Sequence, residues 1–426
     1  MDRRVLGCLL SGVSLVIATG VVSVIVAISW WMLYALLHAR YPSLDHNVVR
    51  VISVGAPLLV GVLLLALWQV GVLLFATSFA QRAVASAQEG RFLEASERLR
   101  MLRNLEPWLR LGGMGGGAWA RLRVAESYAY ALHGLSDEAA RMALEEAQFP
   151  WRPSLSRAAA AVAAIAATDS ADPATWTALE KHLIWAEGDG VSPNAQTLLA
   201  CRGMSRALAL DLEGASRDAA LLESKAPEGR AAAGLRGAIA FWRGQWADAD
   251  RELLRSRSTP PAGHPDGAPI PANANHGVDA QRIELAREMG DAPRALALTE
   301  ALAAEKPTHR SARIVIACVR GEQGSPDSAL LELESIAAQW PFSPATLASV
   351  AFARSRVEKA RGNHAGALSA LAPALSSPHL AVRQLALLEA GDACAAQGDP
   401  ETARRRWSEA IAFGTPSSAG ARAASR

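Results

Sequence analysis

The chain has 426 residues, of which 50% are hydrophobic and 20% are charged, and 43 Lys and Arg side chains nearly balance 41 Asp and Glu. A chain of this length forms roughly two to four domains with hydrophobic cores of their own, so folding requires neither disulfides nor a structural metal. The net charge of +2 argues against a dedicated nucleic-acid-binding protein, and the four cysteines stand too far apart in sequence for a CxxC zinc or redox motif.

Two long uncharged runs stand near the start of the chain. Neither Val5–Leu37 nor Val51–Ala80 contains an Asp, Glu, Lys or Arg residue. Each run exceeds the roughly 20 apolar residues that cross a bilayer as a helix. The runs predict a transmembrane helical hairpin within residues 1–80, with its two spans at about 9–31 and 53–78.

The aromatic and basic residues around these runs predict how the hairpin lies in the membrane. Trp30, Trp31 and Tyr34, at the end of the first run, are typical of the interfacial belt of a membrane helix. The loop between the runs has only two arginines, Arg40 and Arg50. The basic residues that flank the hairpin are Arg3, Arg4, Arg82, Arg91, Arg98, Arg100 and Arg103. Because basic residues beside membrane spans stay in the cytoplasm, we expect a multi-pass protein of the bacterial inner membrane with both termini and the remaining chain in the cytoplasm.

A repeating pattern begins at Gln81. Short stretches rich in Ala, Leu, Arg and Glu, which favour helices, are separated by glycine or proline. The separating glycines are Gly90, Gly134, Gly214, Gly244, Gly290, Gly324, Gly362 and Gly398. The residue five positions after each glycine is an alanine, namely Ala95, Ala139, Ala219, Ala249, Ala295, Ala329, Ala367 and Ala403. Seven positions before most of the glycines stands a small residue: Ala83, Ser127, Ala207, Gly237, Ala317, Ser355 or Gly391.

Each recurrent position has a physical role. A glycine can take the left-handed conformation that ends the first helix of a pair. The small residue before it and the alanine after it allow two antiparallel helices to approach closely. Prolines stand 17 positions after four of the glycines, where they end the second helix. The pattern resembles the tetratricopeptide repeat (TPR) family, whose unit is a helix–turn–helix of about 34 residues.

The resemblance is most specific from about Gln281 onward, where successive glycines are 34, 38 and 36 residues apart. It implies an all-α fold, in which residues 81–413 form a TPR-like α-solenoid of antiparallel helix pairs. Upstream the spacing is irregular, and one gap of 80 residues predicts a further, divergent pair within Ser154–Glu187. The insertion 258–277 has five prolines and no aromatic residue, which predicts a mobile loop. Residues 414–426 are expected to be a disordered tail.

No motif for catalysis, cofactor binding or metal binding stands out. The glycine run Gly112–Gly117 lacks the Lys-Ser/Thr of a phosphate-binding loop and follows a predicted helix rather than a strand. The nine histidines are scattered without a paired metal-binding spacing. We therefore expect no enzymatic activity, no cofactor and no metal, and neither nucleic acid nor a small-molecule substrate as a ligand.

Candidate partner-binding residues follow from the resemblance. The first helices of TPR units line a concave groove that holds peptides, which implies that Arg313, Arg320 and Arg356 lie in the groove of this chain. Arginine binds carboxylates bidentately, so these three residues would hold a carboxylate of the partner. The alternative is that the arginines solvate a helix face and pair with acidic neighbours, namely Glu322, Glu332 or Glu358.

The predicted function is that of a membrane-anchored, TPR-like scaffold or adaptor that binds a protein partner at the bacterial inner membrane. A stack of helix pairs offers an extended concave surface, which suits a helical or extended peptide. The alternative is an accessory subunit of a membrane transport or secretion complex, in which the hairpin itself forms an interface.

Overall fold

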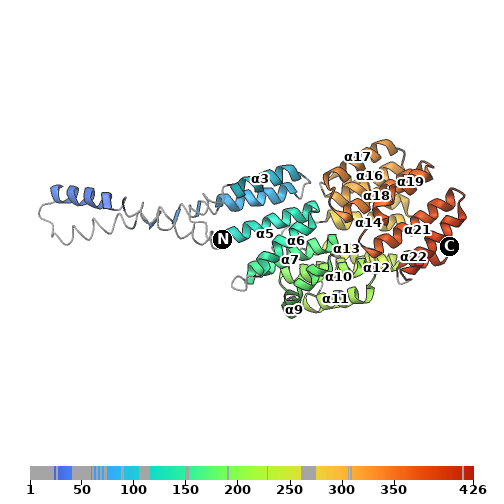
Figure 1. Cartoon of the computed structure of the whole chain (residues 1–426), viewed down its shortest axis with the longest axis horizontal. Coiled ribbons are helices and arrows are strands. Elements are labelled where there is room, and N and C mark those ends of the chain that lie inside the picture. Colours follow the sequence, from blue (N-terminus) through green and yellow to red (C-terminus); the bar gives the residue numbers. More distant parts are fainter. Residues whose placement is uncertain are drawn as a thin grey trace. The chain divides into compact units, whose positions relative to one another are not determined.

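The computed structural model describes residues 24, 27–40, 59, 62–63, 66–67, 70–71, 74–87, 91–104, 116–148, 153–189, 191–227, 229–260, 275–305, 307, 309–414 and 417–426. All regular secondary structure in these residues is helical (Figure 1). The chain divides into two compact units. The smaller unit comprises residues 1–85 and 93–126, and the larger unit comprises residues 86–92 and 127–426.

In the smaller unit, three helical segments pack together. The first segment is residues 74–85 of a helix that continues to residue 87, and the second is α3 (Phe92–Asn104) from residue 93 onward. The third is the part of α5 (Gly116–His133) up to residue 126. The buried side chains of their shared core are each no more than 6% exposed: Ala76, Ala80, Leu102 and Leu122. Small residues at the first two of these positions let the segments approach closely.

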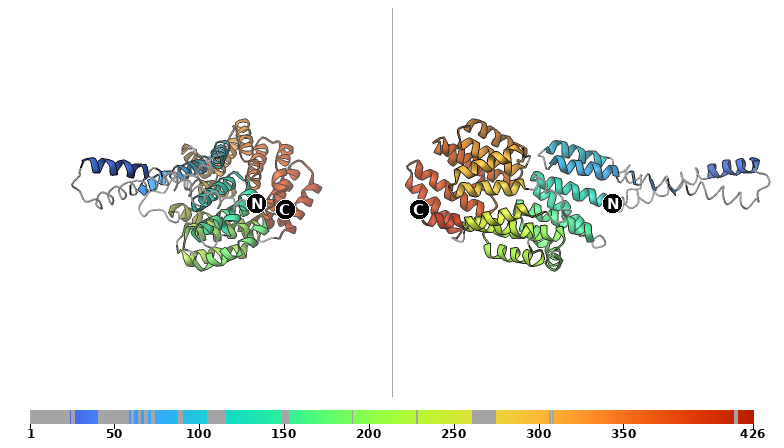
Figure 2. Two further views of the ribbon diagram at one scale, coloured as in Figure 1. Left: turned by 60° about the vertical axis from the view of Figure 1, so that its left-hand side comes forward. Right: turned by 180° about the vertical axis from the view of Figure 1, so that it is seen from behind.

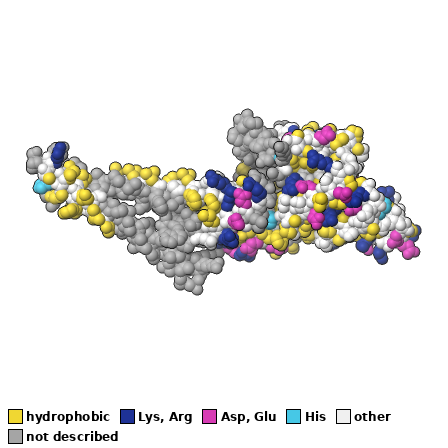
Figure 3. Space-filling model, turned by 90° about the horizontal axis from the view of Figure 1, so that it is seen from above, with side chains coloured by type: hydrophobic (Ala, Val, Ile, Leu, Met, Phe, Trp, Pro, Cys, Tyr) yellow, Lys and Arg dark blue, Asp and Glu magenta, His cyan; other side chains and the backbone are white. Residues whose placement is uncertain are grey.

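The expected transmembrane hairpin, residues 1–80, lies largely outside the described residues. No helix formed by the residues that are described is both long and apolar enough to cross a membrane. Thirteen large apolar side chains described between residues 24 and 75 are exposed, by 37–68%. Figure 3 shows hydrophobic side chains, in yellow, along the surface of this part of the chain.

The larger unit is a stack of helices in which sequence neighbours pack against each other (Figure 1, Figure 2). After α5 its helices are α6 (Ser136–Ala147), α7 (Pro153–Ser170), α8 (Pro173–Ala178), α9 (Glu180–Asp189), α10 (Pro193–Leu208), α11 (Leu212–Lys225), α12 (Arg230–Arg243), α13 (Trp246–Ser258), α14 (His276–Glu288), α15 (Ala292–Ala304), α16 (Arg310–Glu322), α17 (Pro326–Gln339), α18 (Pro344–Ala360), α19 (His364–Ala370), α20 (Ala372–Leu375), α21 (Leu380–Ala396), α22 (Pro400–Ala412) and α23 (Ser418–Ala424). The first helices of successive pairs are also in contact, as α14 is with α16 and α16 is with α18. This packing is consistent with a helical solenoid.

Left-handed glycines turn the chain within most of the pairs. Six of the predicted glycines have φ between +72° and +110° at the end of a first helix, namely Gly134, Gly244, Gly290, Gly324, Gly362 and Gly398. Gly90 lies outside the described residues. The prediction for Gly214 is wrong, because this glycine lies inside α11 and the left-handed residue of its pair is Leu210 (φ +67°). The Asp211 carboxylate accepts a hydrogen bond from the Gly214 backbone N–H at 2.8 Å, and this cap starts α11 ahead of the glycine.

The recurrent alanines lie at the seams between helices. Each of the eight is only 0–3% exposed: Ala95, Ala139, Ala219, Ala249, Ala295, Ala329, Ala367 and Ala403. The small residues before the turns are packed just as closely. A Cβ added at Gly391 would stand 2.4 Å from Trp407 Nε1, and one at Gly237 would stand 2.9 Å from the Leu253 side chain. A larger residue at either position would force the two helices apart.

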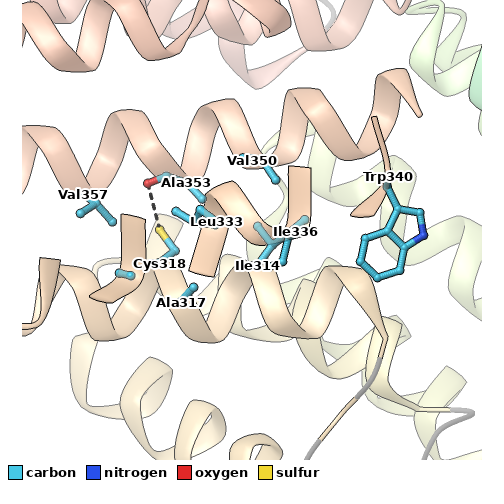
Figure 4. Close-up of a cluster of buried hydrophobic side chains, with 10 residues drawn as sticks. Ile314, Ala317, Cys318, Leu333, Ile336, Trp340, Val350, Ala353 and Val357 are labelled. Carbon is cyan, nitrogen blue, oxygen red and sulfur yellow. Dashed lines mark hydrogen bonds between the residues drawn. The ribbon is translucent and has the colours of Figure 1, made fainter. Parts of the chain in front are cut away.

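Figure 4 shows one such seam, where α16, α17 and α18 bury a shared core. Leu333 and Ile336 of α17 are fully buried in the same cluster as Ile314 of α16 and Val357 of α18. The Cys318 thiol lies there too and donates a hydrogen bond to the Ala353 carbonyl at 3.7 Å. A core that two successive pairs share makes each pair depend on its neighbour, as in repeat proteins generally.

The gap of 80 residues between recognisable turns contains additional helices of the stack. α7 ends at Ala171, which has a left-handed φ of +57°, and α8 and α9 follow it. α7 contacts α6 on one side and α10 on the other. The divergent pair expected within residues 154–187 therefore corresponds to α7 followed by α8 and α9.

Of the two segments expected to be irregular, one is largely outside the described residues and the other contains a helix. Of the insertion 258–277, residues 261–274 lie outside the described residues, and its ends belong to α13 and α14. Residues 414–426, expected to be a disordered tail, instead contain α23. Ala419 and Ala423 of α23 are 1% and 2% exposed and pack in one cluster with side chains of α21 and α22. The small side chains of this segment, which suggested disorder in the sequence, allow α23 to pack closely against its neighbouring helices.

Candidate functional site

The structure separates the three candidate groove arginines. Arg313 of α16 donates hydrogen bonds to Glu332 Oε1 of α17 at 2.6 and 3.0 Å, which is the pairing foreseen in the alternative interpretation. Arg320, also on α16, is exposed, and no ion pair of its side chain is found with the described residues. Arg356 of α18 pairs with Glu284 and Glu288 of α14. The three arginines therefore do not converge on one carboxylate position.

The pairing of Arg356 belongs to a larger cluster, which we call the α14 network. Its members, from α14, α16, α18 and α23, are Glu284, Arg287, Glu288, Glu322, Arg356 and Arg422. Three glutamates and three arginines balance each other, and their side chains are 12–37% exposed.

The geometry of the α14 network links helices that are distant in sequence. Arg356 Nη2 lies 2.8 Å from Glu288 Oε1, and Arg422 Nη1 lies 3.1 Å from Glu288 Oε2, so this one carboxylate joins α14 to both α18 and α23. Arg287 lies 2.9 Å from Glu284 on its own helix and also pairs with Glu322 of α16. Glu284, Arg287 and Glu288 share one face of α14 because they are three and four residues apart.

The electrostatics of the α14 network favour the charged forms of Glu284 and Arg356. Burial by itself raises the pKa of Glu284, but Arg356 and Arg287 outweigh it and keep that pKa below its usual value. Burial likewise lowers the pKa of Arg356, and the surrounding carboxylates, Glu284 foremost, more than restore it. Arg356 is therefore engaged within the chain, and a partner carboxylate would have to displace two glutamates to reach it.

A second cluster, the Asp169 junction, lies at the end of α7. Ser136 donates a hydrogen bond to Asp169 Oδ2 at 2.7 Å, and Ser343 donates to Oδ1 at 2.9 Å. His379 Nε2 lies 3.0 Å from the Asp169 carbonyl, and Arg310 donates to Ser343 Oγ at 3.1 Å. Asp169, Ser136, Ser343 and His379 are each no more than 8% exposed. The junction thus connects residues 174 and 210 positions apart in the chain.

Burial dominates the electrostatics beside this junction. Burial, together with the nearby Arg310, lowers the pKa of His133 to about 4. The same two causes, with His276 as a third, lower the pKa of His309 to about 4. Burial also lowers the pKa of His379, which Asp169 partly offsets. These histidines are neutral at pH 7, so the junction holds its residues by hydrogen bonds rather than by histidine charge.

Three cysteines, Cys201, Cys318 and Cys394, lie in the described part of the chain. No group of three or more His, Cys, Asp or Glu side chains there is placed to hold a metal ion. Burial raises the pKa of the Cys201 thiol to about 11 and that of Cys318 to about 12, so neither is a thiolate nucleophile at neutral pH.

Some of these residues carry a signal in the sequence and others do not. The spacing of Glu284, Arg287 and Glu288 places three charges on one helix face, which marks that face as a candidate contact. Nothing near Asp169 or Ser343 in the sequence indicates that they meet, because their contact depends on how the whole stack curves.

No protein-family model matches the sequence, and a search of curated proteins finds no significant match.

Proposed function

We propose that the chain is a membrane-anchored, TPR-like scaffold that binds a protein partner at the bacterial inner membrane, with the solenoid in the cytoplasm. The distribution of exposed apolar side chains carries the proposal. Among the described residues, thirteen of the twenty-one exposed large hydrophobic side chains lie between residues 24 and 75. A concentration of exposed apolar surface marks contact with a membrane or with another protein. The two uncharged runs, each long enough to cross a bilayer, favour the membrane.

The solenoid supplies the binding function in this proposal. Stacked helix pairs present long surfaces on which a helix or an extended peptide docks. Arg356 is paired within the α14 network and Arg313 is paired with Glu332. Arg320 is exposed and forms no ion pair with the described residues, so it is the candidate arginine best placed to meet a partner carboxylate. A protein with an acidic segment is the partner that such an arginine fits.

Alkaline carbonate extraction of cell membranes tests the anchor. The full chain should remain with the membrane, and a form lacking residues 1–80 should be released. Release of the full chain would contradict the proposal, because an integral hairpin is not extracted by high pH.

Replacing residues 1–80 with an unrelated membrane anchor separates the two roles of the hairpin. A scaffold keeps its partner after the replacement, as judged by recovery from detergent extracts. Loss of the partner would instead identify the hairpin as an interface of a larger membrane complex. Arg320→Glu should weaken partner recovery, whereas Arg404→Glu, at an exposed site on α22, serves as the matched control.

A further inference from the structure

The smaller unit carries an excess of positive charge. Its described residues include seven arginines and three glutamates, with no lysine and no aspartate. Six of the arginines lie on the three packed segments, namely Arg82, Arg98, Arg100, Arg103, Arg121 and Arg123. The whole chain is nearly balanced in charge, so this excess is a local property of the smaller unit, which also contains the apolar runs.

Two of the three glutamates are already engaged. Glu94 pairs with Arg98 on α3, and Glu126 lies 3.1 Å from Arg103. Arg82, Arg100 and Arg121 are exposed and form no ion pair with the described residues. We call these three residues the basic surface. Glu97 is the remaining acidic side chain of the described part of the unit, so the surface keeps a net positive charge.

The three arginines belong to one small packed body. Arg82 lies on the segment 74–87, Arg100 on α3 and Arg121 on α5, whose apolar sides share a core around Leu102 and Leu122. Arg98 also donates a hydrogen bond to the Arg82 carbonyl at 3.1 Å, which ties α3 to the first segment. The three arginines are therefore carried by helices that share one hydrophobic core.

The basic surface begins directly after the exposed apolar residues. Leu74 and Phe75 are 63% and 48% exposed and start the helical segment that continues to residue 87. At 1.5 Å per residue, Arg82 lies about 10 Å beyond Phe75 along this helix. If Phe75 lies at the edge of the hydrocarbon region, that distance places the Arg82 backbone just outside the headgroup layer, which is about 5–8 Å thick on each side. The long Arg82 side chain can reach back from there to the lipid phosphates.

We propose that Arg82, Arg100 and Arg121 bind the headgroups of anionic phospholipids at the membrane surface. This inference rests on the proposed membrane anchor and adds the class of lipid that the anchor region recognises. Guanidinium groups bind phosphate oxygens bidentately, and a negatively charged leaflet attracts basic side chains close to its surface. The charge complementarity and the continuity with the apolar run both favour this ligand over an acidic protein.

Lipid selectivity of the reconstituted full chain tests the inference. The chain is placed in phosphatidylcholine vesicles that contain either spin-labelled phosphatidylglycerol or spin-labelled phosphatidylcholine, and electron paramagnetic resonance measures the lipid immobilised by the protein. The wild type should favour the anionic label, and this preference should fall as salt is raised. The triple variant R82Q/R100Q/R121Q should lose preference by up to roughly fivefold for each arginine.

Two further variants complete the experiment. R354Q/R404Q/R405Q removes the same charge from exposed sites in the larger unit and should keep the preference. R82K/R100K/R121K retains the charge and should keep most of the preference for the anionic label. This variant separates loss of lipid binding from misfolding. An equal loss in the control variant, or a wild type without anionic preference, would overturn the inference. If carbonate extracts the full chain, the membrane anchor fails and the inference fails with it; if the chain stays membrane-bound but shows no preference, the inference alone fails.

Discussion

Single positions in the stack are constrained by space and by charge. At Gly391 the ring of Trp407 fills the volume that a side chain would need, and Trp407 Nε1 donates a hydrogen bond to Asp392 at 3.2 Å, so the ring is held in place. At His133 the surroundings exclude water, and the nearby Arg310 disfavours a second positive charge. The first constraint is steric and the second electrostatic, and each has a measurable consequence.

Gly391→Ala should destabilise the larger unit by about 1–3 kcal/mol, because the added Cβ overlaps the Trp407 ring and pushes α21 from α22. Urea denaturation followed by circular dichroism measures the loss. Gly188→Ala is the matched control, since a Cβ there meets nothing within 4 Å and alanine favours a helix. Equal stability of the two variants would contradict the close packing of α21 and α22.

His133 predicts a pH dependence of stability. Its pKa is about 4 in the folded chain and near 6.5 when unfolded, so the unfolded state binds more protons between these values. The free energy of unfolding should therefore fall as the pH falls from 6.5 to 4, by at most about 3 kcal/mol for this residue. His133→Gln should flatten the profile in that window. Parallel profiles of the wild type and the variant would contradict the prediction.

Helix α23 is the element whose role depends most on distant partners. It contacts α12 as well as α21 and α22, and its Arg422 pairs with Glu288 of α14. Its buried side chains are small, Ala419 and Ala423, so apolar burial alone is a weak anchor for seven residues. We therefore expect the ion pair to contribute to holding this helix in place.

A double-mutant cycle with Glu288→Gln and Arg422→Gln tests the role of this pair. The coupling free energy should be about 0.5–1 kcal/mol, since Arg422 is 37% exposed and solvent screens the pair. Thermal unfolding of the four proteins supplies the measurement. Glu288→Gln alone should cost more than Arg422→Gln, because it also leaves Arg356 with one partner fewer. Additive effects of the two substitutions would show that α23 is held by packing alone.

The larger unit as a whole is more than a chain of nearest neighbours. In a simple solenoid each pair contacts only the adjacent pairs. Here the Asp169 junction joins α6 and α7 to Ser343 and His379, and α10 contacts α21. A Cβ at Gly134 would stand 2.4 Å from Ser343 Cβ, so the two segments touch at this point. Contacts between residues so far apart in the sequence should make the unit unfold as one cooperative body.

Ser343→Ala should weaken that cooperativity. It removes the donor to Asp169 Oδ1 and the acceptor for Arg310, and leaving buried polar groups unpaired costs about 2–4 kcal/mol. Equilibrium unfolding should show a smaller denaturant dependence or two separated transitions. Ser349→Ala, on the exposed side of α18, should leave the transition unchanged. An unchanged single transition in Ser343→Ala would show that the junction does not couple the ends of the unit.

The sequence by itself determined the local features of this protein. The all-helical class, the turns at six of the eight glycines and the buried alanines follow from backbone conformation and helix spacing, which act over a few residues. The left-handed turns at Leu210 and Ala171 were not predicted because neither residue is a glycine; each is followed instead by an aspartate, Asp211 or Asp172, that caps the next helix.

Only the tertiary structure decided which distant residues meet. Arg356 pairs with Glu284 from 72 residues away, and Asp169 meets His379 from 210 residues away. Such meetings depend on the rotation between successive helix pairs, which accumulates along the stack. A small change in that rotation at each step moves the far end by many ångströms, and no local pattern of residues records the sum.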